Sequence, residues 1–195
     1  MKVNKRILIL CEGMTEYIYV KSLQRDLPRT QQRGISVEII YQTQNDPKSL
    51  ALEAKRKQKI AQRERNPYDV IWLFFDHDNS PNLKKAFEII NKEGFRVAYT
   101  SICFEHWFIL HFESCGKPFN SGQEALKYLQ KLWPYYHKTK SNPYEQLRDK
   151  LEQAVIRAEI IMKNNADNAH IFERNPYFTV QELIGFFNEL KGGNS

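Results

Sequence analysis

Several features are scarce in this chain of 195 residues, and each shortage argues against a class of protein. No apolar stretch approaches the roughly 20 residues that a helix needs to span a bilayer, so we expect no membrane-spanning segment. The cysteines are only three, Cys11, Cys103 and Cys115, without CxxC spacing. This pattern argues against a zinc site and indicates free thiols in a reducing compartment, and we expect a cytoplasmic protein.

Three common functional motifs are also missing. The chain has no GxxxxGK[ST] P-loop, so any use of ATP would require another chain. His106 and His111 are five residues apart and do not form HExxH, which argues against a zinc protease; we expect both to be partly buried and hydrogen-bonded. The opening MKVNKRILILCEG has an apolar run too short for a signal peptide, and an acidic residue closes it.

The chain does have a mild excess of positive charge. It contains 29 basic and 23 acidic residues, a net charge of +6, with 42% hydrophobic residues typical of a globular protein. Residues 48–65 hold seven basic and two acidic residues, which supply most of the surplus. This segment is either a solvated helix face or a surface that follows the phosphates of a polyanion. On the second reading, the candidate substrate-binding residues are Lys55, Arg56 and Lys59.

The first hundred residues alternate between strand-like and helix-like patterns. Apolar or β-branched runs predict strands, and periodic apolar positions predict helices between them. The predicted strands cover 6–11, 35–41, 69–76 and 95–102, and the predicted helices cover 15–27, 46–65 and 82–94. Asp46 and Pro47 are suited to open the second helix, and Gly94 to end the third. We therefore expect an α/β fold with a mostly parallel, Rossmann-like sheet of about four strands, flanked by helices.

The second half of the chain is predicted to be helical. Amphipathic or apolar segments occur at 104–113, 122–133, 143–164 and 179–190. We expect residues 1–104 to form the α/β core and residues 105–195 to form a helical extension packed on it, both within one compact unit.

Acidic residues follow two of the predicted strands. Glu12 ends the first strand, and Asp76 and Asp78 end the third. In an open α/β sheet, ligands bind outside the carboxyl ends of the strands. Alternate residues of an extended segment point the same way, so Asp76 and Asp78 would face one site and His77 would turn aside. If the first and third strands are neighbours, Glu12 faces the aspartate pair.

Several carboxylates this close together repel one another unless a divalent cation lies between them. Oxygen ligands suit Mg²⁺ or Mn²⁺ and do not suit zinc, so we expect Glu12, Asp76 and Asp78 to be metal ligands. The alternative is structural, because Asp78, Asn79 and Ser80 are all suited to cap the next helix.

Two further glutamates have both a structural and a functional interpretation. Glu16 falls in the first turn of the first helix, where an acid interacts favourably with the helix dipole. That role is the simpler one, and contact with a metal near Glu12 is the alternative. Glu105 follows the fourth strand and opens an otherwise apolar helix. It is either an ordinary first-turn acid or a further member of the carboxylate cluster.

The segment YYHKTK, residues 135–140, mixes aromatic and basic side chains. Lys138 and Lys140, interleaved with tyrosines, suit stacking on bases and contact with phosphates. The alternative is a surface loop between two helices.

Three motifs in this order carry a family resemblance. The segments ILILCEGMTEYIYV, DVIWLFFDHDN and ICFEHWFILHFE, with NPYFTVQEL downstream, resemble the RloB-like family, also seen as a component of AbiL-type abortive-infection systems. The Glu-Gly and DxD elements are similar to a Toprim core, as in topoisomerases, primases and small nucleases. The resemblance implies Glu12 as general acid or base and Asp76 and Asp78 as metal ligands. From its position after the fourth strand, Glu105 is a further candidate catalytic residue. His77 departs from the lysine or asparagine-like residue common in that family, so we assign it no catalytic role.

The resemblance and the acidic site together imply a Mg²⁺-dependent nuclease acting on DNA or RNA in an anti-phage system. A second hypothesis is a non-catalytic, nucleic-acid-binding or regulatory subunit of a separately encoded ATPase. A nucleotidyl-transfer enzyme is a third and ranks last, because the sequence offers no separate cradle for a nucleotide.

Overall fold

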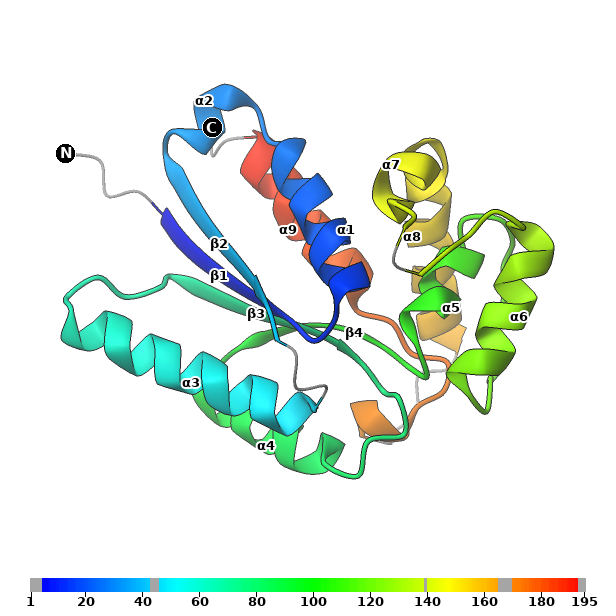
Figure 1. The fold of residues 1–195 in the computed structure, drawn as a ribbon, viewed down its shortest axis with the longest axis horizontal. Helices are drawn as coiled ribbons and strands as arrows, with labels where there is room; N and C mark the ends of the chain where they lie inside the picture. The colour runs from blue at the N-terminus through cyan, green and yellow to red at the C-terminus, as the bar shows by residue number, and fades with distance from the viewer. Residues whose placement is uncertain (1–4, 43–45, 139, 165–169, 193–195) are drawn as a thin grey trace.

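The structure, a computed structural model, describes residues 5–42, 46–138, 140–164 and 170–192. Its centre is a four-stranded, all-parallel sheet with the order β2-β1-β3-β4 (Figure 1). The strands are β1 (Lys5–Cys11), β2 (Ile35–Tyr41), β3 (Val70–Asp76) and β4 (Arg96–Thr100). The prediction of a mostly parallel α/β sheet is therefore confirmed, and β1 and β3 are neighbours.

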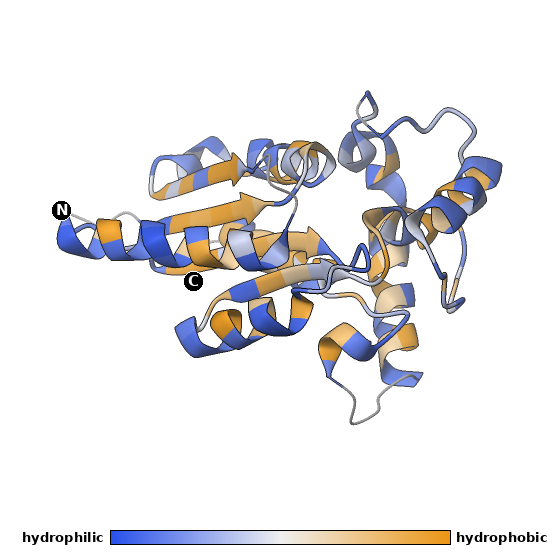
Figure 2. Ribbon diagram, turned by 60° about the horizontal axis from the view of Figure 1, so that its bottom comes forward, coloured by the Kyte–Doolittle hydropathy of each residue, from blue (hydrophilic) through white to orange (hydrophobic). Residues whose placement is uncertain are grey.

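Helices cover both faces of the sheet. Helices α1 (Met14–Arg25) and α9 (Val180–Gly192) pack on one face, and α3 (Pro47–Arg63) and α4 (Leu83–Glu93) pack on the other (Figure 1). Alternate residues of β1 supply the two cores, Ile7 and Ile9 to the first and Leu8 and Leu10 to the second. The central strands β1 and β3 are buried over most of their length and are correspondingly apolar, whereas the edge strand β2 is only partly buried. The hydropathy colouring of Figure 2 shows the predominantly apolar sheet.

Local signals set the ends of two helices on the second face. The Asp46 side chain accepts a hydrogen bond from the Ser49 backbone N–H at 2.9 Å, and Pro47 occupies the first helical position of α3. Gly94 ends α4 with φ of +70°, a left-handed conformation that glycine adopts without the strain imposed by a Cβ atom. Both features agree with the sequence.

The remaining helices are α2 (Arg29–Gln32), α5 (Phe104–Ile109), α6 (Gly122–Leu132), α7 (Pro143–Leu147) and α8 (Leu151–Asn164), with 3₁₀ turns η1 (Arg148–Lys150) and η2 (Ile171–Glu173). The prediction of a single helix over residues 143–164 is wrong, because the 3₁₀ turn η1 separates α7 from α8. The two parts have different partners: Tyr144 donates to Asp26 at 2.7 Å beside α1, whereas Arg157 donates to the Leu110 carbonyl at 2.7 Å.

The end of the chain returns to the α/β core. Phe178 forms an antiparallel bridge with Thr100 of β4, and Thr179 donates to the Val97 carbonyl at 2.9 Å. Helix α9 then lies beside α1 on the sheet (Figure 1). None of the helices formed by the described residues has the length and apolar composition needed to traverse a bilayer.

Candidate active site

The acidic residues predicted at two strand ends meet at the carboxyl edge of the sheet. The Glu12 N–H donates to the Phe74 carbonyl at 2.9 Å, which ties the end of β1 to β3. A hollow of about 180 Å³ lies there, lined by Glu12, Gly13, Met14, Thr15, Glu16, Asp76, Asp78 and Lys138. Glu12 thus shares one hollow with both aspartates. The His77 ring lies elsewhere, with Nε2 at 3.2 Å from the Phe172 carbonyl oxygen.

Glu12 and Glu16 are both buried, with exposed fractions of 9% and 6%. Burial, with each group's acidic neighbours, raises the pKa of each carboxyl to about 7. Glu16 lies so close to Gly13 that a Cβ added there would be 2.7 Å from Glu16 Oε2. The absence of a side chain at Gly13 therefore makes room for the Glu16 carboxylate. Glu16 lies in the first turn of α1, as expected, and also lines the acidic hollow; its contact with a metal stays a prediction.

Asp76 is the last residue of β3, and both Asp76 and Asp78 line the hollow that contains Glu12. Burial, followed by the charges of Glu16 and Glu12, raises the pKa of Asp76 well above its usual range. The Phe104 N–H donates to Asp76 Oδ2 at 3.3 Å, so α5 also begins at this site. The helix-capping alternative does not hold for Asp78, because α4 begins after Asn82.

Glu105 and Lys138 join the cluster from the helical half. Glu105 is 2% exposed; it accepts a hydrogen bond from the Tyr136 hydroxyl at 3.1 Å and lies 3.7 Å from Lys138 Nζ. Burial alone would lower the pKa of Lys138, but the carboxylates of Glu105, Asp76 and Glu16 outweigh it and raise that pKa. A second hollow, of about 410 Å³, is lined by Asp76, Asp78, Asn79, Cys103, Glu105, Ser121, Gly122, Gln123, Leu126 and Lys138. Lys138 therefore lies between the two hollows.

The donor set fits a hard divalent cation. Carboxylates line both hollows, and burial together with the neighbouring acidic charges raises the pKa values of Glu12, Glu16 and Asp76. A cation bound among these oxygen ligands would stabilise their charged forms. Within the described part of the chain, however, no three His, Cys, Asp or Glu side chains are already arranged to hold a metal ion. Binding of Mg²⁺ or Mn²⁺ by Glu12, Asp76 and Asp78 would thus require their side chains to move inward.

The other basic residues predicted to bind substrate lie outside these hollows. Lys55 pairs with Glu93 at 2.6 Å, and Arg56 forms two hydrogen bonds with Glu53, at 2.6 and 2.7 Å. Lys59 is exposed on the same helix, α3. Lys140 is exposed in the loop after α6. Five basic residues were predicted to bind substrate. Among the described residues that line the two hollows, Lys138 is the only one of these five.

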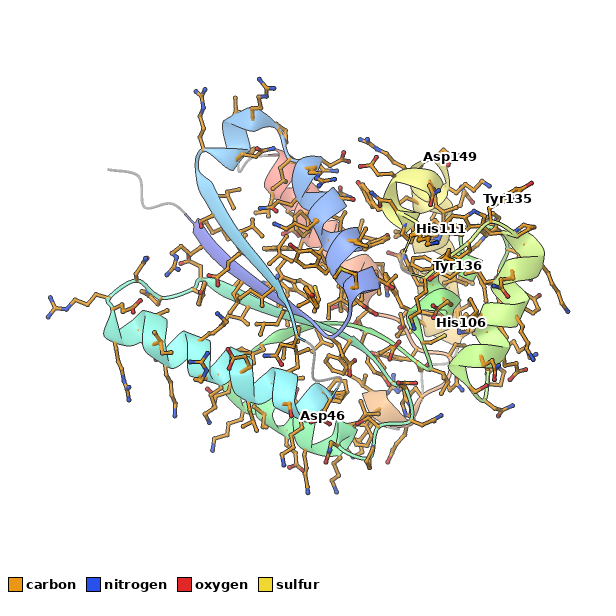
Figure 3. All side chains as sticks on the ribbon, in the orientation of Figure 1. Asp46, His106, His111, Tyr135, Tyr136 and Asp149 are labelled. Atoms are coloured by element: carbon orange, nitrogen blue, oxygen red, sulfur yellow. The ribbon has the colours of Figure 1, made fainter. Side chains whose placement is uncertain are left out.

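The aromatic part of the 135–140 segment divides between core and surface. Tyr136 is 4% exposed and binds Glu105, whereas Tyr135 is 90% exposed; Figure 3 labels both. No pattern in the sequence indicated that Tyr136 contacts a carboxylate. His106 and His111 are more deeply buried than expected, and each has a ring nitrogen within 3.1 Å of a backbone carbonyl oxygen. Burial lowers the pKa of both histidines to about 4, and neither lines the acidic hollows.

Comparison with known families places these residues in context. The family model described as RloB-like protein matches residues 7–186, which include the whole acidic cluster. Searches of curated proteins and of solved structures give no significant match. The family resemblance seen in the sequence is therefore confirmed at this level, and the chain belongs to the RloB-like protein family.

Proposed function

We propose that this protein is a Mg²⁺-dependent nuclease with a Toprim-like core that hydrolyses phosphodiester bonds of DNA or RNA. The observation that carries the proposal is the hollow in which Glu12, Glu16, Asp76 and Asp78 lie together beside Lys138. Carboxylates assembled at the carboxyl edge of a parallel sheet suit metal-assisted phosphoryl chemistry. The fold adds support, because the Glu-Gly and DxD elements follow adjacent strands.

Each residue has a role that follows from its place. Asp76, Asp78 and Glu12 are the proposed ligands of Mg²⁺ or Mn²⁺. The bound metal would polarise the phosphate and offset the charge that develops on it. Glu12 is also the proposed general acid or base: its pKa is about 7 in the metal-free protein, and a bound cation would lower that pKa and favour the form that accepts a proton. Lys138 offers its ammonium group to a phosphate oxygen, and Glu105 with Tyr136 holds that lysine in position.

The resemblance to AbiL-type systems extends the proposal to biology. We place the nuclease in an anti-phage abortive-infection or restriction-associated system of the cytoplasm, with a separately encoded ATPase as partner. The chain itself has no P-loop, which agrees with ATP use by another subunit.

A non-catalytic, nucleic-acid-binding subunit is the second candidate. It is favoured by one observation, that no three-residue metal group is preformed among the described side chains. Co-purification with an ATPase, together with no cleavage by the isolated chain in Mg²⁺ or Mn²⁺, would support this alternative over the nuclease.

The decisive experiment combines metal binding with cleavage. Isothermal titration with Mn²⁺ and cleavage of labelled DNA and RNA are measured for wild type, Asp76→Ala and Asp69→Asn. Asp69 is the matched control, because it is an exposed acid at the opposite end of the same strand region, where it accepts from the Arg6 N–H at 2.7 Å. We expect Asp76→Ala to lose both Mn²⁺ binding and cleavage while remaining folded, and Asp69→Asn to keep both. Equal cleavage by folded Asp76→Ala and wild type would refute the assignment.

A further inference from the structure

Two tyrosines are in contact beside the acidic hollow: Tyr41 is exposed, and Tyr17 is partly buried against the core. The ring centroids of Tyr17 and Tyr41 are 5.4 Å apart, with their planes inclined at 57°. Tyr41 is 40% exposed, and the nearby Met14, which lines the hollow, is 38% exposed. Single exposed apolar side chains are ordinary on protein surfaces, but a contacting aromatic pair next to a candidate catalytic site suggests recognition of a ligand.

The backbone ties this pair closely to Glu12. Tyr41 is the last residue of β2 and lies opposite Cys11 in the parallel register, one residue before Glu12. The Tyr17 N–H donates to the Gly13 carbonyl at 3.2 Å, in the first turn of α1. Strand β2 ends and helix α1 begins next to the acidic site. A ligand bound at that site can therefore reach both tyrosines.

A cation accompanies the aromatic pair. Lys21 Nζ lies 5.7 Å from the centroid of the Tyr17 ring, one helical turn further along α1. Aromatic faces beside lysines are the combination that binds single-stranded nucleic acid, because bases stack on the rings and phosphates pair with the cations. A base inside a duplex has both faces covered by its neighbours, so only an unpaired base can use such a surface.

We propose that Tyr17 and Tyr41 form a stacking platform for an unpaired nucleobase next to the scissile phosphate, so that the substrate is single-stranded at this point. The inference rests on the proposed nuclease function and narrows its substrate class. It also moves the expected stacking position away from the 135–140 segment, where Tyr135 is exposed but Tyr136 is buried against Glu105. Tyr135 is thus the rival position, and a protein partner is the rival occupant.

The test measures binding without cleavage. Fluorescence anisotropy with a labelled single strand, and with its duplex, is recorded in the absence of divalent metal. We expect the single strand to bind more tightly than the duplex. Stacking is worth about 1–3 kcal/mol per base, so Tyr41→Ala should weaken single-strand binding about 5- to 150-fold, with less effect on the duplex. Tyr41→Trp should retain binding. Tyr41→Leu keeps apolar packing without a flat ring and should behave like the alanine variant.

A strand with one abasic position supplies the control for the base itself. The abasic position is moved along the strand in a series of substrates. At one position, we expect the missing base to weaken binding by wild type but to weaken binding by Tyr41→Ala very little, because both changes remove the same contact. Equal binding by wild type and Tyr41→Ala, a larger loss with Tyr135→Ala, or no single-strand binding at all would each overturn the platform. Loss of co-purification with a protein partner in Tyr41→Ala, without any change in single-strand affinity, would reassign the surface to that partner.

The failures of the two proposals are distinguishable. Cleavage that requires Asp76 but is unaffected by Tyr17→Ala and Tyr41→Ala would remove the platform and leave the nuclease standing. Tyrosine-dependent binding of single strands without metal-dependent cleavage would keep the platform and remove the nuclease.

Discussion

Helix α3 is rich in basic residues and the hollow is rich in acidic residues, but the two clusters differ in how far their charges are paired. On α3, three consecutive basic residues, Lys55, Arg56 and Lys57, each lie within ion-pair distance of a glutamate, at 2.6, 2.6 and 3.5 Å. In the hollow, Glu12, Glu16, Asp76 and Asp78 lie together, with Lys138 as the only cation among the described lining residues. These three basic residues of α3 are paired, whereas the four acids of the hollow share one nearby cation.

This difference indicates which charge cluster serves a function. Ion pairs exposed to water contribute about 0–1 kcal/mol each to the free energy of unfolding, so the pairs on α3 have little effect on stability. Crowded, buried carboxylates reduce stability, as the pKa values of about 7 for Glu12 and Glu16 reflect. Such an arrangement is typical of sites that bind a cation or transfer a proton. The predictions that follow test this contrast by removing one charge from each region.

The largest effect is expected from Glu12→Gln. A general acid or base contributes about 10²–10⁴-fold to a rate, so the variant should lose metal-dependent cleavage by about that factor. It should nevertheless be more stable than wild type at neutral pH, because an uncharged amide replaces a carboxyl whose pKa burial raises to about 7. Single-turnover cleavage and urea unfolding measure the two effects.

Glu53→Gln on α3 is the matched control. Glu53 pairs with Arg56 on the surface and should contribute neither to cleavage nor, beyond about 1 kcal/mol, to stability. A Glu12→Gln variant that cleaves as fast as Glu53→Gln would remove Glu12 from the chemistry.

The next effect compares two lysines. Lys138→Met removes the cation near the buried Glu105, which keeps its hydrogen bond from the Tyr136 hydroxyl, and this loss should cost more than the loss of a surface ion pair. Lys55→Met breaks a surface pair and should cost less than about 1 kcal/mol. Thermal unfolding of both variants tests this order. Added Mn²⁺ should stabilise Lys138→Met more than it stabilises wild type, because the metal replaces the missing positive charge. Equal stabilisation of the two proteins would argue against a metal site among these carboxylates.

The positions of Glu12, Asp76 and Asp78 could be anticipated because the strand pattern is strong. Continuous apolar runs such as VIWLFFD indicate strands buried on both faces, and parallel strands end at one edge. Once β1 and β3 are neighbours, Glu12 necessarily lies near the aspartates. The general position of the acidic site therefore follows from local sequence.

Contacts between distant segments could not be read in the same way. Glu16 has an adequate local explanation as a first-turn acid, and its place in the hollow beside Asp76 and Lys138 depends on segments far along the chain. Tyr136 and Tyr135 are adjacent and identical in type, yet one is buried on Glu105 and the other is exposed. Helix α7, which the sequence did not separate from α8, bonds through Tyr144 to Asp26, more than a hundred residues away in sequence. Tertiary partners decided each of these cases.

A pH-dependent effect is expected for Glu16→Gln. The pKa of Glu16 is raised from 4.5 to about 7 on folding, so between these values the folded state holds a proton that the unfolded chain has released. Stability from this group is therefore present below pH 4.5 and lost as the pH rises through 7. Glu16→Gln should be about as stable as wild type near pH 4.5 and about 1–3 kcal/mol more stable above pH 7.

Urea unfolding at several pH values measures this difference. Saturating Mn²⁺ should reduce it at high pH, because the metal stabilises the charged cluster of the wild type more than that of the variant. A difference in stability that does not change with pH would contradict the crowding of Glu16 with its acidic neighbours.

The smallest effect concerns the basic face of α3, where the sequence left open a solvated helix or a phosphate-tracking surface. Each phosphate contact contributes about 0.7–0.9 to the slope of log affinity against log salt. Lys55 is already paired with Glu93, whereas Lys59 is exposed. If α3 follows the substrate, Lys59→Gln should reduce the slope by somewhat less than one, and Lys55→Gln should reduce it by less than that. Anisotropy titrations over a series of KCl concentrations measure both slopes. Unchanged slopes for both variants would identify α3 as a solvated face, and equal reductions would mean that the Lys55–Glu93 pair opens when nucleic acid binds.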